Sequence, residues 1–138
     1  MQNYLPVLLL LVFCSALAWH CGELQQSFAE GERLYKANCA NCHMDDGVGL
    51  GGLIPPLAGS DYLAAHREAL PCMLRKGLEG PIVVNGKTYN EKMPGIPTLT
   101  PIQVTNLLNY INQAWGNKNG PYRLDEVTKA MEKCESFN

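Results

Sequence analysis

The sequence lacks an excess of either charge, a hydrophobic run long enough to cross a membrane, and any internal repeat. Its 11 Lys and Arg nearly balance its 13 Asp and Glu, so the composition does not indicate the strongly basic surface of a nucleic-acid-binding protein. The apolar run Leu5–Ala18 is shorter than the about 20 residues that a membrane-spanning helix needs. The 138 residues therefore fit one small domain, which would bury too little surface to be comfortably stable alone.

One short motif, Cys39-Ala40-Asn41-Cys42-His43, carries most of the functional information in the chain. Cys-x-x-Cys-His is the spacing that attaches haem covalently, because two thiols separated by two residues can add to the two vinyl groups of one porphyrin. The next side chain, His43, is then placed against the iron from one face. A buried haem would also supply the core that so small a domain lacks.

Two other chemistries use parts of this motif. A thioredoxin-like redox pair sits between a strand and a helix start, whereas here a helical segment precedes Cys39 and a glycine-rich loop follows the motif. A structural zinc site needs a fourth ligand, normally from a second tight Cys or His pair, and the remaining candidates, His66, Cys72 and Cys134, are scattered. A chance match among six cysteines is the third alternative. Haem attachment is the interpretation that the surrounding sequence favours.

Residues 1–21 are interpreted as an export leader. Its core is almost wholly apolar and Ala16-Leu17-Ala18 resembles a small-x-small cleavage site, so we expect cleavage after Ala18 or before Cys21. The first four residues lack the usual Lys or Arg, and a buried helix is the alternative interpretation. Export to the periplasm suits a haem-c protein, because this haem is attached outside the cytoplasm.

The remaining cysteines raise a second question about the exported chain. If Cys21 became the lipid-bearing first residue of a lipoprotein, Cys72 and Cys134 would be left to pair as a disulfide, which an oxidising compartment permits. The residues before Cys21 form a poor lipidation signal, and Cys14 is a competing acceptor. Single buried thiols are the alternative for Cys72 and Cys134.

The rest of the sequence predicts short helices and one hairpin. Ser27 begins a capping box in front of a helix that leads into the Cys-x-x-Cys-His motif. Two short apolar or β-prone runs within residues 82–89 flank Asn85-Gly86, a strong hairpin signal. Thr100 caps the best-patterned helix, whose apolar stripe runs as far as Trp115.

These residues resemble the class I c-type cytochromes, monohaem electron carriers with the haem near the start of the chain. The resemblance extends over about residues 27–115. In that family a glycine and an aromatic residue precede the first haem cysteine by eight and four positions, as Gly31 and Tyr35 do. A leucine and an aromatic residue of the last helix pack across that glycine, and Leu107 and Tyr110 match them.

The resemblance implies an all-α cytochrome c fold, in which three to five short helices wrap around one covalently bound haem c, with a small β-hairpin insertion. We assign residues 22–120 to this cytochrome c domain. Residues 121–138 place apolar side chains on one helical face, so we assign them to a C-terminal helical extension that packs on the domain.

The resemblance also implies the surroundings of the haem iron. The family's haem-binding histidine is held by a proline carbonyl twelve residues later, followed by a leucine that contacts the porphyrin; Pro55 and Leu57 match, and Pro56 is the neighbouring alternative. The family's sixth ligand is the methionine of a Met-Pro pair in a loop, which corresponds to Met93. Met73 falls on an apolar helical face, where a packing role is expected.

The implied function is that of a one-electron carrier in an extracytoplasmic respiratory or dehydrogenase-linked chain, and not that of an enzyme. The expected partners are a redox donor and acceptor of the quinol-cytochrome c reductase, dehydrogenase or terminal oxidase type, with membrane contact only through a lipid on Cys21. One alternative is a haem enzyme or sensor with an open sixth position, for which His66 is the candidate distal histidine or replacement ligand. Another is a fixed cytochrome subunit of a larger oxidoreductase.

Overall fold

A computed structural model describes residues 8–9 and 25–134 of the chain. The export leader apart from residues 8 and 9, its cleavage site after Ala18, and the competing lipid acceptors Cys14 and Cys21 lie outside the described residues. Within the described part of the chain, the helices are too short or too polar to cross a membrane.

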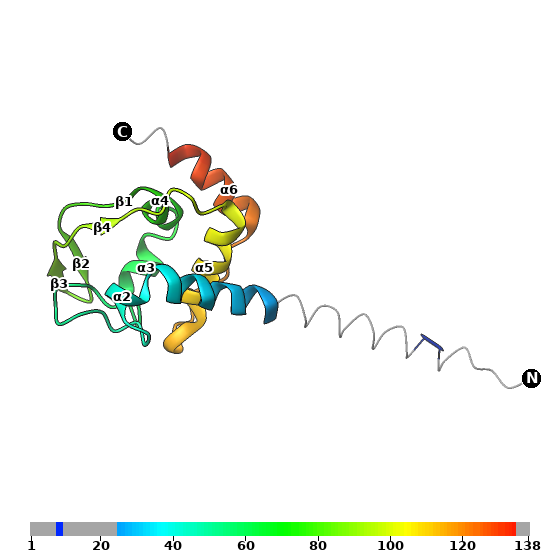
Figure 1. The fold of residues 1–138 in the computed structure, drawn as a ribbon, viewed down its shortest axis with the longest axis horizontal. Helices are drawn as coiled ribbons and strands as arrows, with labels where there is room; N and C mark the ends of the chain where they lie inside the picture. Colours follow the sequence, from blue (N-terminus) through cyan, green and yellow to red (C-terminus); the bar gives the residue numbers. More distant parts are fainter. Residues whose placement is uncertain (1–7, 10–24, 135–138) are drawn as a thin grey trace, which may run out of the picture.

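The described chain is mainly helical, with four very short strands, and the expected helical fold class with a small hairpin is confirmed. Figure 1 shows the strands gathered on one side of the body, with α5 and α6 on the other. A helix at residues 25–38 comes first. The elements after it are α2 (Ala40–His43), α3 (Asp61–Ala65), α4 (Leu70–Lys76), β1 (Gly77–Leu78), β2 (Ile82–Val84), β3 (Lys87–Tyr89), β4 (Met93–Pro94), α5 (Pro101–Gln113), η1 (Ala114–Gly116) and α6 (Leu124–Lys133).

The helix at residues 25–38 leads directly into the Cys-x-x-Cys-His motif, but the predicted cap at Ser27 is wrong. Residues 25 and 26 are already helical, so Ser27 lies inside the helix. Glu30 and Arg33 instead form an exposed ion pair one turn apart, with 2.7 Å between carboxylate and guanidinium. Such surface pairs add little stability, so the helix depends on the contacts of its apolar face.

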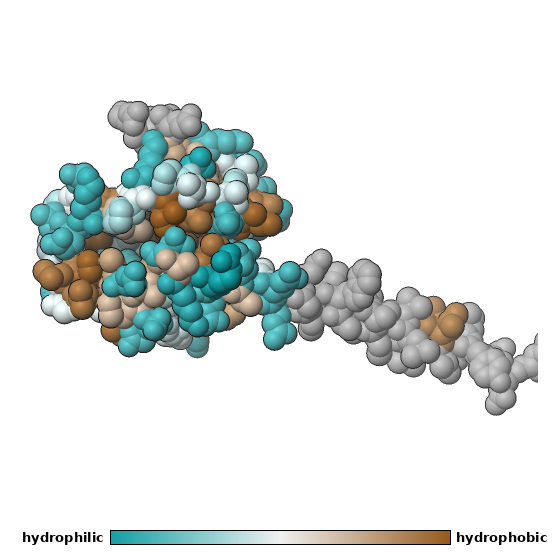
Figure 2. Space-filling model, viewed as in Figure 1, coloured by the Kyte–Doolittle hydropathy of each residue, from teal (hydrophilic) through white to brown (hydrophobic). Residues whose placement is uncertain are grey.

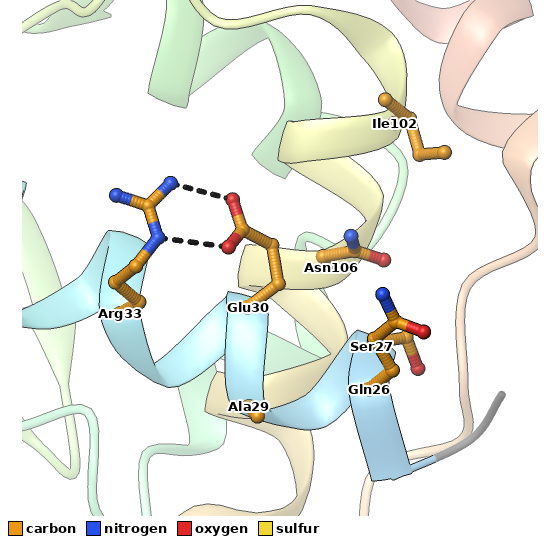
Figure 3. A pocket seen from close by; sticks show the side chains of 7 residues that line it. All are labelled: Gln26, Ser27, Ala29, Glu30, Arg33, Ile102 and Asn106. Atoms are coloured by element: carbon orange, nitrogen blue, oxygen red, sulfur yellow. Dashed lines mark hydrogen bonds and ion pairs between the residues drawn. The ribbon is translucent and has the colours of Figure 1, made fainter. Parts of the chain in front are cut away.

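This helix crosses α5 at Gly31. A Cβ atom on Gly31 would lie closer than a non-bonded contact to the backbone oxygen of Asn106 and to the Cβ of Tyr110. The close approach brings together Tyr35 and Leu107, both with 0% of their surface exposed. Figure 3 shows the pocket beside this crossing, with Glu30 paired to Arg33 on one helix and Asn106 on α5 lying near Gln26 and Ser27.

The start of α5 was predicted correctly and its end was not. The hydroxyl of Thr100 accepts a hydrogen bond from the Gln103 backbone N–H at 3.4 Å, and the Gln103 side chain accepts one from the Thr100 N–H at 3.0 Å. This capping box supports the predicted N-terminus. The regular helix ends at Gln113, before Trp115, because Trp115 adopts a left-handed φ of 53° in the following 3₁₀ turn.

Two antiparallel strand pairs lie on the side of the molecule away from α6. The predicted hairpin is present: β2 pairs with β3 around Asn85 and Gly86, whose φ values of 50° and 75° suit a type I′ turn. The second pair, β1 with β4, was not predicted. It places Leu78 opposite Met93.

The last helix, α6, packs on α4 and α5. Val127 on its inner face is fully buried, and a disulfide joins Cys134 at its end to Cys72 of α4. Arg67 supports the approach to α6, because its guanidinium donates to the carbonyl oxygens of Gly120 and Pro121 at 2.7 and 2.6 Å. Residues 121–134 are therefore held against the body both by the disulfide and by hydrogen bonds.

Candidate functional site

The Cys-x-x-Cys-His motif occupies a single helical turn. The N–H of His43 donates to the Cys39 carbonyl at 2.9 Å, so the two cysteines and the histidine lie within one turn. Cys39 and His43 are buried, whereas Cys42 is exposed, and both cysteines have free thiols. The chain reverses at Met44, whose φ of 63° ends the turn immediately after the histidine.

The imidazole of His43 is held from behind by the loop that follows. Its Nδ1 lies 3.0 Å from the carbonyl oxygen of Pro55. A carbonyl can only accept, so Nδ1 carries the proton and Nε2 keeps its lone pair for a metal. Burial lowers the pKa of His43, which favours the neutral, ligating form. The structure thereby places the Pro55 carbonyl, and not that of Pro56, in hydrogen-bonding contact with the imidazole.

An uncharged cleft lies beside this turn. Its lining residues come from the motif, the loop at residues 55–60, and elements from α3 through α5. None of these lining residues is Asp, Glu, Lys or Arg, and the imidazole of His43 is neutral. They are Cys39, His43, Pro55, Pro56, Leu57, Ser60, Tyr62, Leu63, Leu70, Met73, Leu74, Leu78, Ile82, Val84, Met93, Leu108 and Ile111. In Figure 2 hydrophobic residues run across the middle of the body, between hydrophilic residues above and below.

Two methionines line this cleft, whereas the sequence predicted Met93 alone. Met93 lies in β4, where the backbone pairing with Leu78 fixes its position. Met73 on α4 also lines the cleft, although a packing role was expected for it. The sulfur of Met73 already lies 4.0 Å from the hydroxyl of Tyr62, which donates to it.

His66 does not reach the cleft. It is exposed, and its ring stacks on that of Tyr62 with 3.8 Å between centroids. One of its ring nitrogens lies 3.2 Å from the Tyr62 carbonyl oxygen. The structure therefore gives no support to His66 as a distal histidine or as a replacement for Met93.

Two residues after α5 hold the loop that carries Pro55, and neither was predicted to be a site residue. The indole N–H of Trp115 donates to the Asp45 carbonyl at 2.9 Å. The amide group of Asn117 donates to the Leu57 carbonyl at 3.0 Å and accepts from the Gly59 N–H at 2.8 Å. No local pattern distinguishes Asn117 from its neighbouring polar residues, because its partners are about sixty positions away in the chain.

The zinc and thiol-redox interpretations find no support in this geometry. Among residues 8–9 and 25–134, no three His, Cys, Asp or Glu side chains form a group that could hold a metal ion. Burial, followed by the nearby Cys42, raises the pKa of the Cys39 thiol to about 11. Reactive redox cysteines have lowered pKa values, since the thiolate is the reactive form.

Comparisons with known proteins agree with the motif and the fold. A family model for cytochrome c matches residues 28–115. The chain belongs to the class I c-type cytochromes. A cytochrome c-552 of Thermus thermophilus is 37% identical over a match of 121 positions, which covers 81% of this chain and 81% of that protein. The similarity thus covers most of both proteins.

Two further relatives extend the comparison. Another cytochrome c-552 from Thermus thermophilus is 38% identical over 114 residues, covering 76% of this cytochrome and 86% of the relative. The cytochrome c subunit of the quinone alcohol dehydrogenase from Gluconacetobacter polyoxogenes is 31% identical over 106 residues. That match covers 74% of this cytochrome but 22% of the subunit, so it concerns one part of a longer protein.

The cytochrome c family binds haem c through covalent bonds, and the residues of this cytochrome fit that group. Two free thiols and an imidazole with an available Nε2 lie on one turn. Cys39 and His43 line an uncharged cleft whose walls also present thioether sulfur, the softer ligand type that c-type haem iron accepts, whereas Cys42 is exposed. The described part of the chain thus offers thiol, imidazole and thioether groups as candidate haem-binding residues.

Proposed function

We propose that this cytochrome carries one electron at a time on a single haem c, attached through Cys39 and Cys42, with His43 and Met93 as the iron ligands. The hydrogen bond from His43 to Pro55 carries this proposal, because it directs Nε2 to the same uncharged cleft that Met93 lines. Haem iron supplies a reversible one-electron change between its ferric and ferrous forms.

The protein's own groups have distinct tasks in this function. The Pro55 carbonyl fixes the tautomer and the orientation of the His43 ring and makes the imidazole a stronger donor. The thioether of Met93 favours the ferrous state, and the uncharged walls, Leu57 among them, exclude water and disfavour additional charge. His43 and Met93 would together hold the iron, so no substrate would have to bind at the metal, and electron transfer and not catalysis is the expected activity.

Met93 is a better ligand candidate than Met73 for two structural reasons. The backbone of Met93 is fixed by its pairing with Leu78, so the side chain starts from a defined position. The sulfur of Met73 is turned toward the Tyr62 hydroxyl, 4.0 Å away, from which it accepts a weak hydrogen bond.

We also propose an extracytoplasmic, periplasmic site of action, after cleavage of the leader behind Ala18 or directly before Cys21. The Cys72–Cys134 disulfide supports it, because such bonds persist in oxidising compartments. Lipidation of Cys21 remains part of the proposal. So does the division into a domain at residues 22–120 and an extension at residues 121–138, which is supported by the packing of α6 on α4 and α5.

The proposed partners are a protein electron donor and a protein acceptor of the reductase, dehydrogenase or terminal oxidase type. One relative is the cytochrome c subunit of a quinone alcohol dehydrogenase, which supports a dehydrogenase as one partner class. Co-purification from membranes distinguishes the arrangements: a fixed subunit stays with its complex, whereas a free shuttle separates from it.

The ferric absorption spectrum tests the ligand assignment. Protein exported by a host that matures haem c should show the weak red charge-transfer band of methionine sulfur on iron. Met93→Leu should abolish the band, and the matched control Met73→Leu, which removes the other cleft sulfur, should keep it. Loss of the band in the Met73 variant alone would overturn the assignment of Met93. Colourless protein would overturn haem binding itself.

A further inference from the structure

The backbones of β1 and β4 approach each other too closely for a side chain at two positions. A Cβ atom on Gly77 would lie 2.7 Å from the backbone nitrogen of Gly95 and in conflict with the Met93 carbonyl. A Cβ atom on Gly95 would lie 2.6 Å from both the Arg75 carbonyl oxygen and the Gly77 nitrogen. All of these obstructing atoms belong to the backbone, so no side-chain rotation can relieve the conflict.

This contact is the point at which β4 is attached to the end of α4. The Ile96 N–H donates to the carbonyl oxygen of Leu74 at 2.8 Å, on the C-terminal side of the glycine contact. On its N-terminal side, Met93 pairs with Leu78. Met93 therefore lies immediately beside a contact between two main chains.

The helix that provides this attachment is itself fixed. Cys72 of α4 is joined to Cys134 of α6, and Leu74 is buried with 6% of its surface exposed. If β4 moved, α4 would therefore stay in place. The movement would shift Met93, whose side chain has to reach a fixed point in the cleft.

We infer that Gly77 and Gly95 are positioning residues for Met93: by allowing the two backbones to touch, they hold the sulfur of Met93 at the iron. The inference rests on the proposed function, because it takes Met93 as the axial ligand. A side chain at either position separates β4 from α4 and withdraws Met93. A merely structural role would lower stability and leave the iron ligand in place.

The two glycines are required for different reasons, which provides matched controls. Gly77 has a φ of +86°, so a side chain there meets both backbone strain and obstruction, whereas Gly80 has a φ of +98° with open space around it. Gly95 has no left-handed φ and faces obstruction alone. Gly120 has neither left-handed φ nor a neighbour within 4 Å. Gly77→Ala is therefore compared with Gly80→Ala, and Gly95→Ala with Gly120→Ala.

The experiment measures the methionine-to-iron band and the affinity for added imidazole, which competes with Met93 for the iron. We expect Gly95→Ala and Gly77→Ala to lose most of the band and to bind imidazole at least about tenfold more tightly, with their controls within about twofold of the parent protein. If both variants keep the band and the imidazole affinity of their controls while their unfolding free energy falls, the inference is wrong. A parent protein without the band would instead refute the assignment of Met93, so the two failures are distinguishable.

Hydrogen exchange on the parent protein tests the same inference without a substitution that could prevent folding. If the backbone contact holds Met93 at the iron, displacing it with imidazole must loosen β4 from α4. The Ile96 amide, which donates to Leu74, should then exchange faster in the imidazole complex. Unchanged exchange at Ile96 would show that the Met93 side chain moves alone, and would overturn the inference.

Discussion

Breaking the Cys72–Cys134 disulfide should strongly destabilise the protein without changing its haem ligands. The bond joins α4 to the end of α6 across a sequence separation of 62 residues. Cys39 and Cys42 both precede this loop, so covalent haem attachment does not shorten it. The conformational entropy that the unfolded chain gains when the bond is broken is therefore calculated for the full separation.

The magnitude follows from the entropy of closing that loop. With a separation of 62 residues, the chain-entropy relation gives about 14 cal/mol/K, or about 4 kcal/mol at 25 °C. A small domain has a total unfolding free energy of about 5–15 kcal/mol, so the bond accounts for a large share of it. The proposed iron ligands His43 and Met93 lie on α2 and β4, and the buried Leu74 keeps α4 packed without the bond, so the haem spectrum should be preserved in the folded protein.

The assay is urea unfolding at 25 °C, followed by far-ultraviolet circular dichroism. All samples are kept in the ferrous state, because a thiol reductant also reduces the haem iron. Reduced parent protein and the Cys72→Ala/Cys134→Ala double variant are each compared with the disulfide-bonded protein. The dependence of unfolding free energy on urea should steepen when the bond is absent, since the unfolded chain then expands and exposes more surface.

Two outcomes would refute this reasoning. A loss below about 1 kcal/mol would mean that the unfolded chain keeps α4 and α6 together without the bond, or that the bond acts on the folded state. A large loss in the double variant with none in the reduced parent protein would assign the effect to packing, because Cys134 is buried with 2% of its surface exposed.

Two further predictions concern the body of the fold. Gly31→Ala should lower the unfolding free energy by about 1–3 kcal/mol, because the new methyl group obstructs the crossing with α5. Gly120→Ala, which adds a methyl group in open space, should change it by less than about 0.5 kcal/mol. Equal urea midpoints for the two variants would contradict the packing argument. Burial raises the pKa of Tyr122 to about 12, so its contribution to stability is fully present below its unfolded pKa of about 10 and is lost as the pH rises through 12. Tyr122→Phe also removes the hydrogen bond to the Arg67 carbonyl and should cost about 1–2 kcal/mol at neutral pH. The unfolding free energy, measured from pH 9 to 12, should fall less steeply with pH in this variant than in the parent protein. Equal slopes would show that the pKa of Tyr122 is the same in the folded and the unfolded protein.

Local signals in the sequence were sufficient for several elements of the fold and for part of the site. The Cys-x-x-Cys-His motif fits on one helical turn, so the relative positions of Cys39, Cys42 and His43 follow from their spacing alone. The hairpin around Asn85-Gly86 and the capped start of α5 are likewise encoded within a few neighbouring residues. The prediction that Ser27 caps the first helix was wrong, because residues 25 and 26 are already helical. The local motif therefore did not determine where the helix begins.

Long-range contacts decided the rest. The β1–β4 pair has two residues in each strand, too few to form a recognisable pattern, and its closeness depends on glycines eighteen positions apart. Asn117 supports the Pro55 loop from the far end of α5, a relation that no local property of an asparagine encodes. The sequence by itself determined which chemistry the protein performs, because a covalent motif is local. Only the tertiary structure decided how the wall of the cleft that carries Met93 is assembled. The backbones of β1 and β4 are distant in the chain and meet there only when the core packs.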